Sequence, residues 1–146
     1  VDRFKAAAQK LGIEVLTASA SSVNEVPQAL NSLKGKICGF WFPTDNVIAS
    51  AAATVAKVAA EAKLPVVASD SALVRAGSLA SISVDYYELG RMTGAMGADI
   101  LEGKKTPGEI PVGFQTAQKP FINLKVAQSI GLELPQALLE RSNVQK

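Results

Sequence analysis

One pattern runs through the whole sequence: short apolar runs alternate with longer segments whose apolar residues recur at helical spacing. The helical segments predict helices at residues 2–11, between Asn24 and Gly35, and at 46–62, 71–76, 86–102, 124–130 and 135–141. The apolar runs predict strands at residues 13–17, 37–42, 65–68, 79–84, 110–114 and 121–123. Alternating strands and helices are typical of an α/β fold with a mainly parallel sheet and right-handed crossovers.

Helix ends can also be predicted from single residues. A glycine follows each of five predicted helices, and such glycines commonly end helices. They are Gly12, Gly35, Gly77, Gly103 and Gly131. Asn24 is the predicted N-cap of the second helix. Asp85, with Glu88 three residues later, resembles a capping box at the start of the helix at 86–102.

The first predicted element is unusual for this fold class, because it is a helix where a central strand is the normal beginning. We therefore expect a first central strand upstream of residue 1. Without it, the neighbouring strands would expose unpaired backbone groups. The chain also begins with Val1 instead of methionine, which suggests a longer precursor or a trimmed chain.

Composition excludes several classes of function. Fifteen basic and 13 acidic residues leave a net charge of +2, without the basic clusters that nucleic-acid binding needs. There is no histidine and only one cysteine, Cys38, which excludes Ser-His and Cys-His dyads, His-bearing zinc sites and an internal disulfide. No apolar run reaches the length of a membrane span. A Gly-Lys-Lys-Thr stretch at 103–106 lacks the first glycine of a P-loop, so we expect no phosphate binding there. Taken together, these features lead us to expect no cofactor and no metal.

Polar residues follow the predicted strands at their carboxyl ends, where open α/β sheets bind ligands. These residues lie at 17–19, 43–46, 69–71 and 85–86, and three successive strands end near an aspartate. Carboxylates suit an ammonium group, whereas hydroxyls and amides suit a carboxylate, so together they favour an α-amino acid. The same residue types are also the usual N-caps of helices, and the two interpretations stay open for each aspartate and for Asn46. The candidate ligand-binding residues are Thr44, Asp45, Asn46, Ser69, Asp70 and Tyr86.

Several blocks of sequence, in order, resemble one family. They are PTDN at 43–46, PVVASD at 65–70, AGSLASISVDYYELG at 76–90, ILEGK at 100–104 followed by IPV at 110–112, and INLKVAQSIGLELPQALLERSNV at 122–144. The resemblance is to the C-terminal half of ABC-transporter substrate-binding proteins with the type I periplasmic-binding fold, a Rossmann-like fold. Members of this family are associated with aromatic amino acids and related small solutes.

The resemblance implies a chain of two α/β lobes, of which the first is absent here. Residues 1–84 would form the incomplete core of the second lobe, 85–112 would cross into the first lobe, and 113–146 would return as strands and C-terminal helices. It places Thr44, Asp45, Asn46, Ser69 and Asp70 at the cleft and Tyr86 on the hinge side.

The predicted function is to bind an amino-acid-like solute, without catalysing any reaction of it, and to deliver it to a membrane permease. The resemblance further implies a periplasmic or lipid-anchored cell-surface protein. A ligand-sensing regulatory domain of the same fold is the alternative, and an α/β enzyme is a weaker one.

Overall fold

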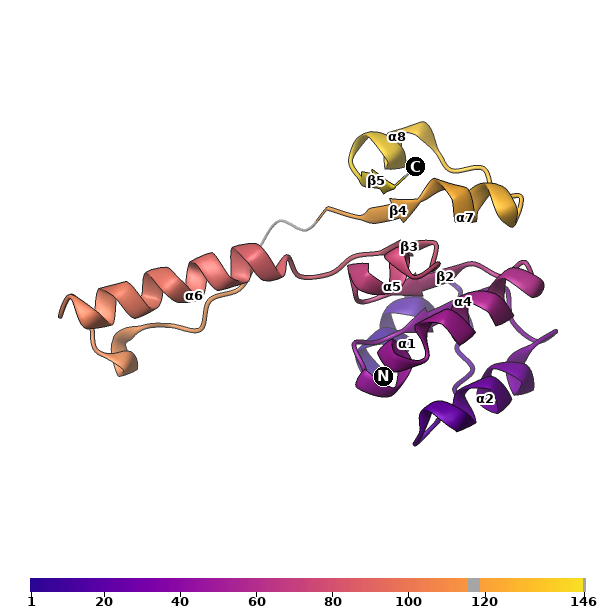
Figure 1. Ribbon diagram of the computed structural model, residues 1–146, viewed down its shortest axis with the longest axis horizontal. Coiled ribbons are helices and arrows are strands. Elements are labelled where there is room, and N and C mark those ends of the chain that lie inside the picture. The colour runs from indigo at the N-terminus through magenta and orange to yellow at the C-terminus, as the bar shows by residue number, and fades with distance from the viewer. Residues whose placement is uncertain (116–118, 146) are drawn as a thin grey trace.

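The computed structural model describes residues 1–115 and 119–145 (Figure 1). Its centre is a five-stranded sheet in the order β1-β2-β3-β4-β5. Strands β1, β2 and β3 are parallel, β4 is antiparallel to β3, and β5 is parallel to β4. The strand bounds are Phe40–Phe42, Val66–Ala68, Ala80–Ser81, Phe121–Asn123 and Asn143–Gln145. The predicted α/β class with a mainly parallel sheet is confirmed.

The predicted helices are present, with small shifts at their ends. The α-helices are α1 Asp2–Lys10, α2 Val26–Leu33, α3 Asn46–Ser50, α4 Ala52–Glu61, α5 Ser71–Arg75, α6 Tyr86–Leu101, α7 Leu124–Ser129 and α8 Gln136–Glu140, and the 3-10 helices are η1 Val23–Glu25 and η2 Pro107–Glu109. The helix predicted at 46–62 is divided at Ala51, the residue at which α3 ends and α4 begins. The five glycines predicted to end helices all have positive φ.

Two predicted strands are wrong. Residues 13–17 and 110–114 belong to no strand, because neither segment pairs with any of the described strands. The predicted strands at 37–42 and 79–84 shrink to β1 and β3, since only these residues pair with β2. Strand β5 was not predicted, because its three residues contain a single apolar side chain, which is too weak a pattern to mark a strand.

The cap prediction for Asn24 is also wrong. Asn24 lies inside η1, whose N-cap is Ser22, and Glu25 bonds back to the two residues that precede this segment. The Ser21 N–H and the Ser22 hydroxyl donate to the two Glu25 carboxylate oxygens at 2.9 and 3.0 Å. These hydrogen bonds favour the charged form and lower the pKa of Glu25 below its ordinary value.

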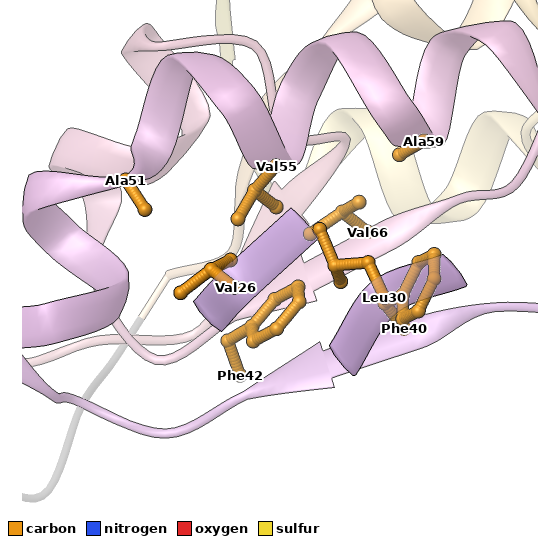
Figure 2. Packing of buried hydrophobic residues seen from close by; sticks show 8 residues of the cluster. All are labelled: Val26, Leu30, Phe40, Phe42, Ala51, Val55, Ala59 and Val66. Carbon is orange, nitrogen blue, oxygen red and sulfur yellow. The ribbon is translucent and has the colours of Figure 1, made fainter. Parts of the chain in front are cut away.

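The main core lies between one face of β1–β2 and three helices (Figure 2). Strand alternation places Phe40 and Phe42 on this face, and their rings lie 5.8 Å apart. Helix α2 adds Val26 and Leu30, β2 adds Val66, and the four-residue spacing of Ala51, Val55 and Ala59 forms an apolar stripe along α4. Trp41 points to the opposite face, where its ring stacks on Phe4 of α1 at 4.0 Å.

Strand β1 forms one edge of this sheet. On its inner side, the Phe40 N–H donates to Pro65 O and the Ser69 N–H donates to Phe42 O, both at 2.9 Å. Alternate residues of a strand bond to opposite neighbours, so the peptide groups of Trp41 face outward. In the described part of the chain, no other strand pairs with that outer side.

Residues 86–113, here called the α6 hairpin, extend away from the sheet (Figure 1). Helix α6 contains no buried residue, although it is 16 residues long. Leu101 is 89% exposed and Val112 is 78% exposed. The returning segment is ordered by a capping box in which Thr106 and Glu109 bond reciprocally, and these bonds lower the pKa of Glu109. The hairpin is thus well formed but presents uncovered apolar side chains.

Replacing Gly77 with alanine is expected to destabilise the protein by about 1–3 kcal/mol. Gly77 has a φ of +120°, and an added Cβ would lie 2.8 Å from the Ala56 Cβ of α4. Gly131→Ala is the matched control, because its φ is +73° and nothing lies within 4 Å of an added Cβ. Urea unfolding should therefore show the larger loss for Gly77→Ala. Equal losses would mean that the contact with α4 contributes nothing.

Candidate functional site

The carboxyl ends of β1 and β2 bring most candidate residues to one edge of the sheet. The two strands are parallel and in register, with Phe42 opposite Ala68. The residues that follow, 43–46 and 69–71, are therefore neighbours, and we call them the rim. The Thr44 hydroxyl donates to the Ser69 carbonyl oxygen at 3.5 Å, which ties the two halves of the rim together.

Asp45 and Asp70 each cap a helix, as one of the two interpretations predicted. The Ile48 N–H donates to Asp45 Oδ1 at 3.0 Å, and the Ala72 N–H donates to Asp70 Oδ1 at 2.7 Å. Asn46 is the first residue of α3 and not its cap. Each cap uses only Oδ1. In the described structure Oδ2 of both aspartates has no hydrogen-bond donor, so capping leaves one oxygen on each carboxylate available to a ligand.

Tyr86 is placed differently from the other candidates. It is the first residue of α6, beyond β3, and its side chain is 59% exposed. Asp85 caps this helix by accepting from the Tyr87 and Glu88 N–H groups at 2.9 and 3.2 Å. The predicted reciprocal bond from the Asp85 N–H to Glu88 is not made, because this N–H donates to Gln115 Oε1 at 2.9 Å. The Glu88 carboxylate lies 3.4 Å from Arg91 Nε instead. Among the described residues, Tyr86 has no stacking or hydrogen-bond contact with the rim.

Residues 17–19 were expected at the same edge, but the segment before them is not a strand. Ser19 instead lines a hollow of about 330 Å³ beside η1 and α2. A second hollow, of about 380 Å³, lies between α6 and residues 107–113. Neither of these hollows is lined by the rim. Residues 43–46 of the rim are exposed and residues 69–71 are half-buried, so the rim is an open edge that carries carboxylates.

Gln115 makes a polar contact that could not be predicted from the sequence. Its side-chain amide bonds to both backbone groups of Asp85, 30 residues earlier in the chain. No local motif signals such a pair, because it depends on two connecting segments lying side by side.

A family model described as "ABC transporter substrate binding protein" matches residues 1–146. The chain belongs to this family. It is a family of solute-binding proteins, and the membership confirms the resemblance drawn from the sequence blocks. None of the described helices is long and apolar enough to cross a membrane. The described residues also contain no cluster of three or more metal-ligating side chains.

Individual known proteins are similar to this chain over nearly all of its length. A tyrosine-binding protein of Clostridioides difficile is 38% identical over 133 residues, which are 91% of this chain and 38% of the relative. A Streptococcus pneumoniae ABC domain, solved in complex with L-Trp, is 35% identical and superposes with a TM-score of 0.87 over 98% of this chain and 48% of its own. A conserved domain protein of Vibrio cholerae also gives 0.87, with 32% identity over 99% of this chain and 49% of its own. The chain thus spans about half the length of these two solved structures. It spans a smaller share, 38%, of the curated relative.

Proposed function

We propose that this chain supplies one side of an amino-acid site in the solute-binding component of an ABC importer. The observation that carries the proposal is the adjacency of Asp45 and Asp70 at one sheet edge, each with a free carboxylate oxygen. An ammonium group is the natural partner of such a pair. Relatives named for tyrosine and solved with L-Trp support an aromatic amino acid as the ligand.

In this proposal the ligand is held by groups of different chemistry. Asp45 or Asp70 pairs with the ammonium group, while the Thr44 and Ser69 hydroxyls and the Asn46 amide bond to its other polar groups. The exposed ring of Tyr86 offers an aromatic surface on the hinge side. Nothing is transformed: closure around the ligand creates the form that the permease recognises, so the protein is not an enzyme.

The same proposal assigns the chain to two lobes. Residues 1–84 belong to the second lobe, 85–112 to the first, and 113–146 return to the second. The exposed apolar side chains of the α6 hairpin support this division, because such groups are normally covered. The match to only about half of each solved relative supports it too. An importer component of this kind works outside the cytoplasm, in the periplasm or lipid-anchored at the cell surface.

Titration calorimetry of the full-length protein tests the ligand class. L-Trp and L-Tyr should bind, whereas indole-3-propionate, which keeps the ring and the carboxylate but lacks the ammonium group, should bind at least about 10-fold more weakly. Tryptamine, which lacks only the carboxylate, reports on the hydroxyl side of the site. Equal affinity for L-Trp and indole-3-propionate would contradict the assignment of the two aspartates.

A further inference from the structure

The α6 hairpin extends from the sheet beyond β3 (Figure 1). Residues 82–85 lead from β3 into α6, and residues 114–115 leave the hairpin in the direction of β4. Strands β3 and β4 pair through Ala80–Ser81 and Phe121–Ile122. Beyond that pairing, residues 82–84 make no hydrogen bond to residues 114–115 or 119–120, the parts of the second connection that the structure describes. Ile82 is also exposed, so this short link is not held by packing.

The next connection is made by Gln115. The Asp85 N–H donates to Gln115 Oε1 at 2.9 Å, and Gln115 Nε2 donates to the Asp85 carbonyl oxygen at 2.6 Å. Two opposed bonds of this kind join hydrogen-bonded residue pairs in antiparallel strands. Here a side-chain amide takes the place of one peptide group. We call this pair of bonds the Gln115 clamp.

We propose that Gln115 is a positioning residue for closure of the binding site. The clamp joins Asp85 to Gln115 at the base of the α6 hairpin, so the two ends of the hairpin move together as one body relative to the sheet. Asp85 also precedes Tyr86, and its side chain caps α6. The clamp therefore fixes where α6 begins and how Tyr86 is directed. This inference rests on the proposed function, because closure matters only if a ligand is bound.

Two substitutions separate the bonds of the clamp. Gln115→Met keeps a similar length and removes both bonds, whereas Gln115→Glu keeps an acceptor for the Asp85 N–H and loses the donor. Gln128→Met on α7 is the matched control, since Gln128 is exposed and its side chain makes no hydrogen bond within the described structure. The Met variant should show the full effect, the Glu variant an intermediate one, and the control none.

The first measurement needs no ligand. Spin labels on exposed Cys38 and on a cysteine introduced by Lys104→Cys, at an exposed polar position of the hairpin, report the distance between the sheet and the hairpin in the full-length protein. Gln115→Met should widen the distance distribution about twofold. The second measurement is stopped-flow dissociation of L-Trp, which should be about 3- to 10-fold faster in Gln115→Met.

The outcomes distinguish the two proposals. An unchanged distance distribution in Gln115→Met overturns the clamp, even if its melting temperature falls, because the bonds would then only add stability. A wider distribution with unchanged L-Trp dissociation overturns the role in closure. If the unmodified protein binds neither L-Trp nor L-Tyr, the proposed function fails, and the distance measurement still decides whether Gln115 orients the hairpin.

Discussion

Replacing Asp45 with asparagine in the full-length protein is expected to weaken L-Trp or L-Tyr binding about 10-fold or more, while leaving stability nearly unchanged. Asparagine is as good an N-cap as aspartate, so it can still accept the Ile48 N–H bond. It cannot supply the negative charge that an ammonium group needs. The same reasoning applies to Asp70→Asn, and the double variant should lose more affinity than either single one.

Alanine at Asp45 provides the comparison that separates the two roles. Asp45→Ala removes both the cap and the charge, so it should lose affinity and also about 1 kcal/mol of stability. Asp85→Asn is the control, because Asp85 caps α6 in the same way but lies outside the rim. Calorimetry and thermal unfolding of the unmodified protein and of these variants give the answer. Unchanged affinity in Asp45→Asn and Asp70→Asn would reduce both residues to caps.

Phe42→Ala is expected to lower the free energy of unfolding by about 3–5 kcal/mol. Phe42 belongs to the core of Figure 2, where it lies beside Phe40 and against α2 and α4. Removing its ring leaves a cavity that the surrounding side chains cannot fill completely. Since whole domains are stable by only about 5–15 kcal/mol, this change approaches the limit of folding. Urea unfolding measures it.

Two neighbouring valines on β2 provide a control for this prediction, because one faces the core and the other does not. Val66 is 2% exposed and faces the same core, whereas Val67 is 40% exposed on the other face of β2. Val66→Ala should therefore cost clearly more than Val67→Ala, although the chemical change is identical. Phe42→Leu keeps most of the volume and should lose about 1.5 kcal/mol or less. Similar losses for both valines, or a loss below about 1 kcal/mol for Phe42→Ala, would mean that this face is not the core.

The fold class and the helix ends were predictable because local chemistry determines them. Apolar spacing marks the buried stripe of α4, and glycines with positive φ end five helices. The position of Asp45 and Asp70 at one edge followed from parallel strand ends alone. Their capping role was one of the two predicted interpretations, and their role toward a ligand stays a prediction.

What could not be predicted depends on partners distant in sequence. Residues 13–17 and 110–114 have strand-like patterns, but a strand also needs a neighbouring backbone to pair with. Strand β5 is the reverse case, since it pairs with β4 despite a weak pattern. Asn24 is not a cap because helical backbone already begins one residue before it, at Val23 of η1. Gln115 reaches Asp85 only because the fold brings their segments together.

The outward-facing peptide groups of Trp41 have a consequence for handling these residues on their own. An edge strand that carries three consecutive aromatic residues is an efficient template for pairing with a second molecule. We therefore expect a preparation limited to these 146 residues to self-associate through β1 at high concentration, and a charged substitution at that edge to improve its solubility.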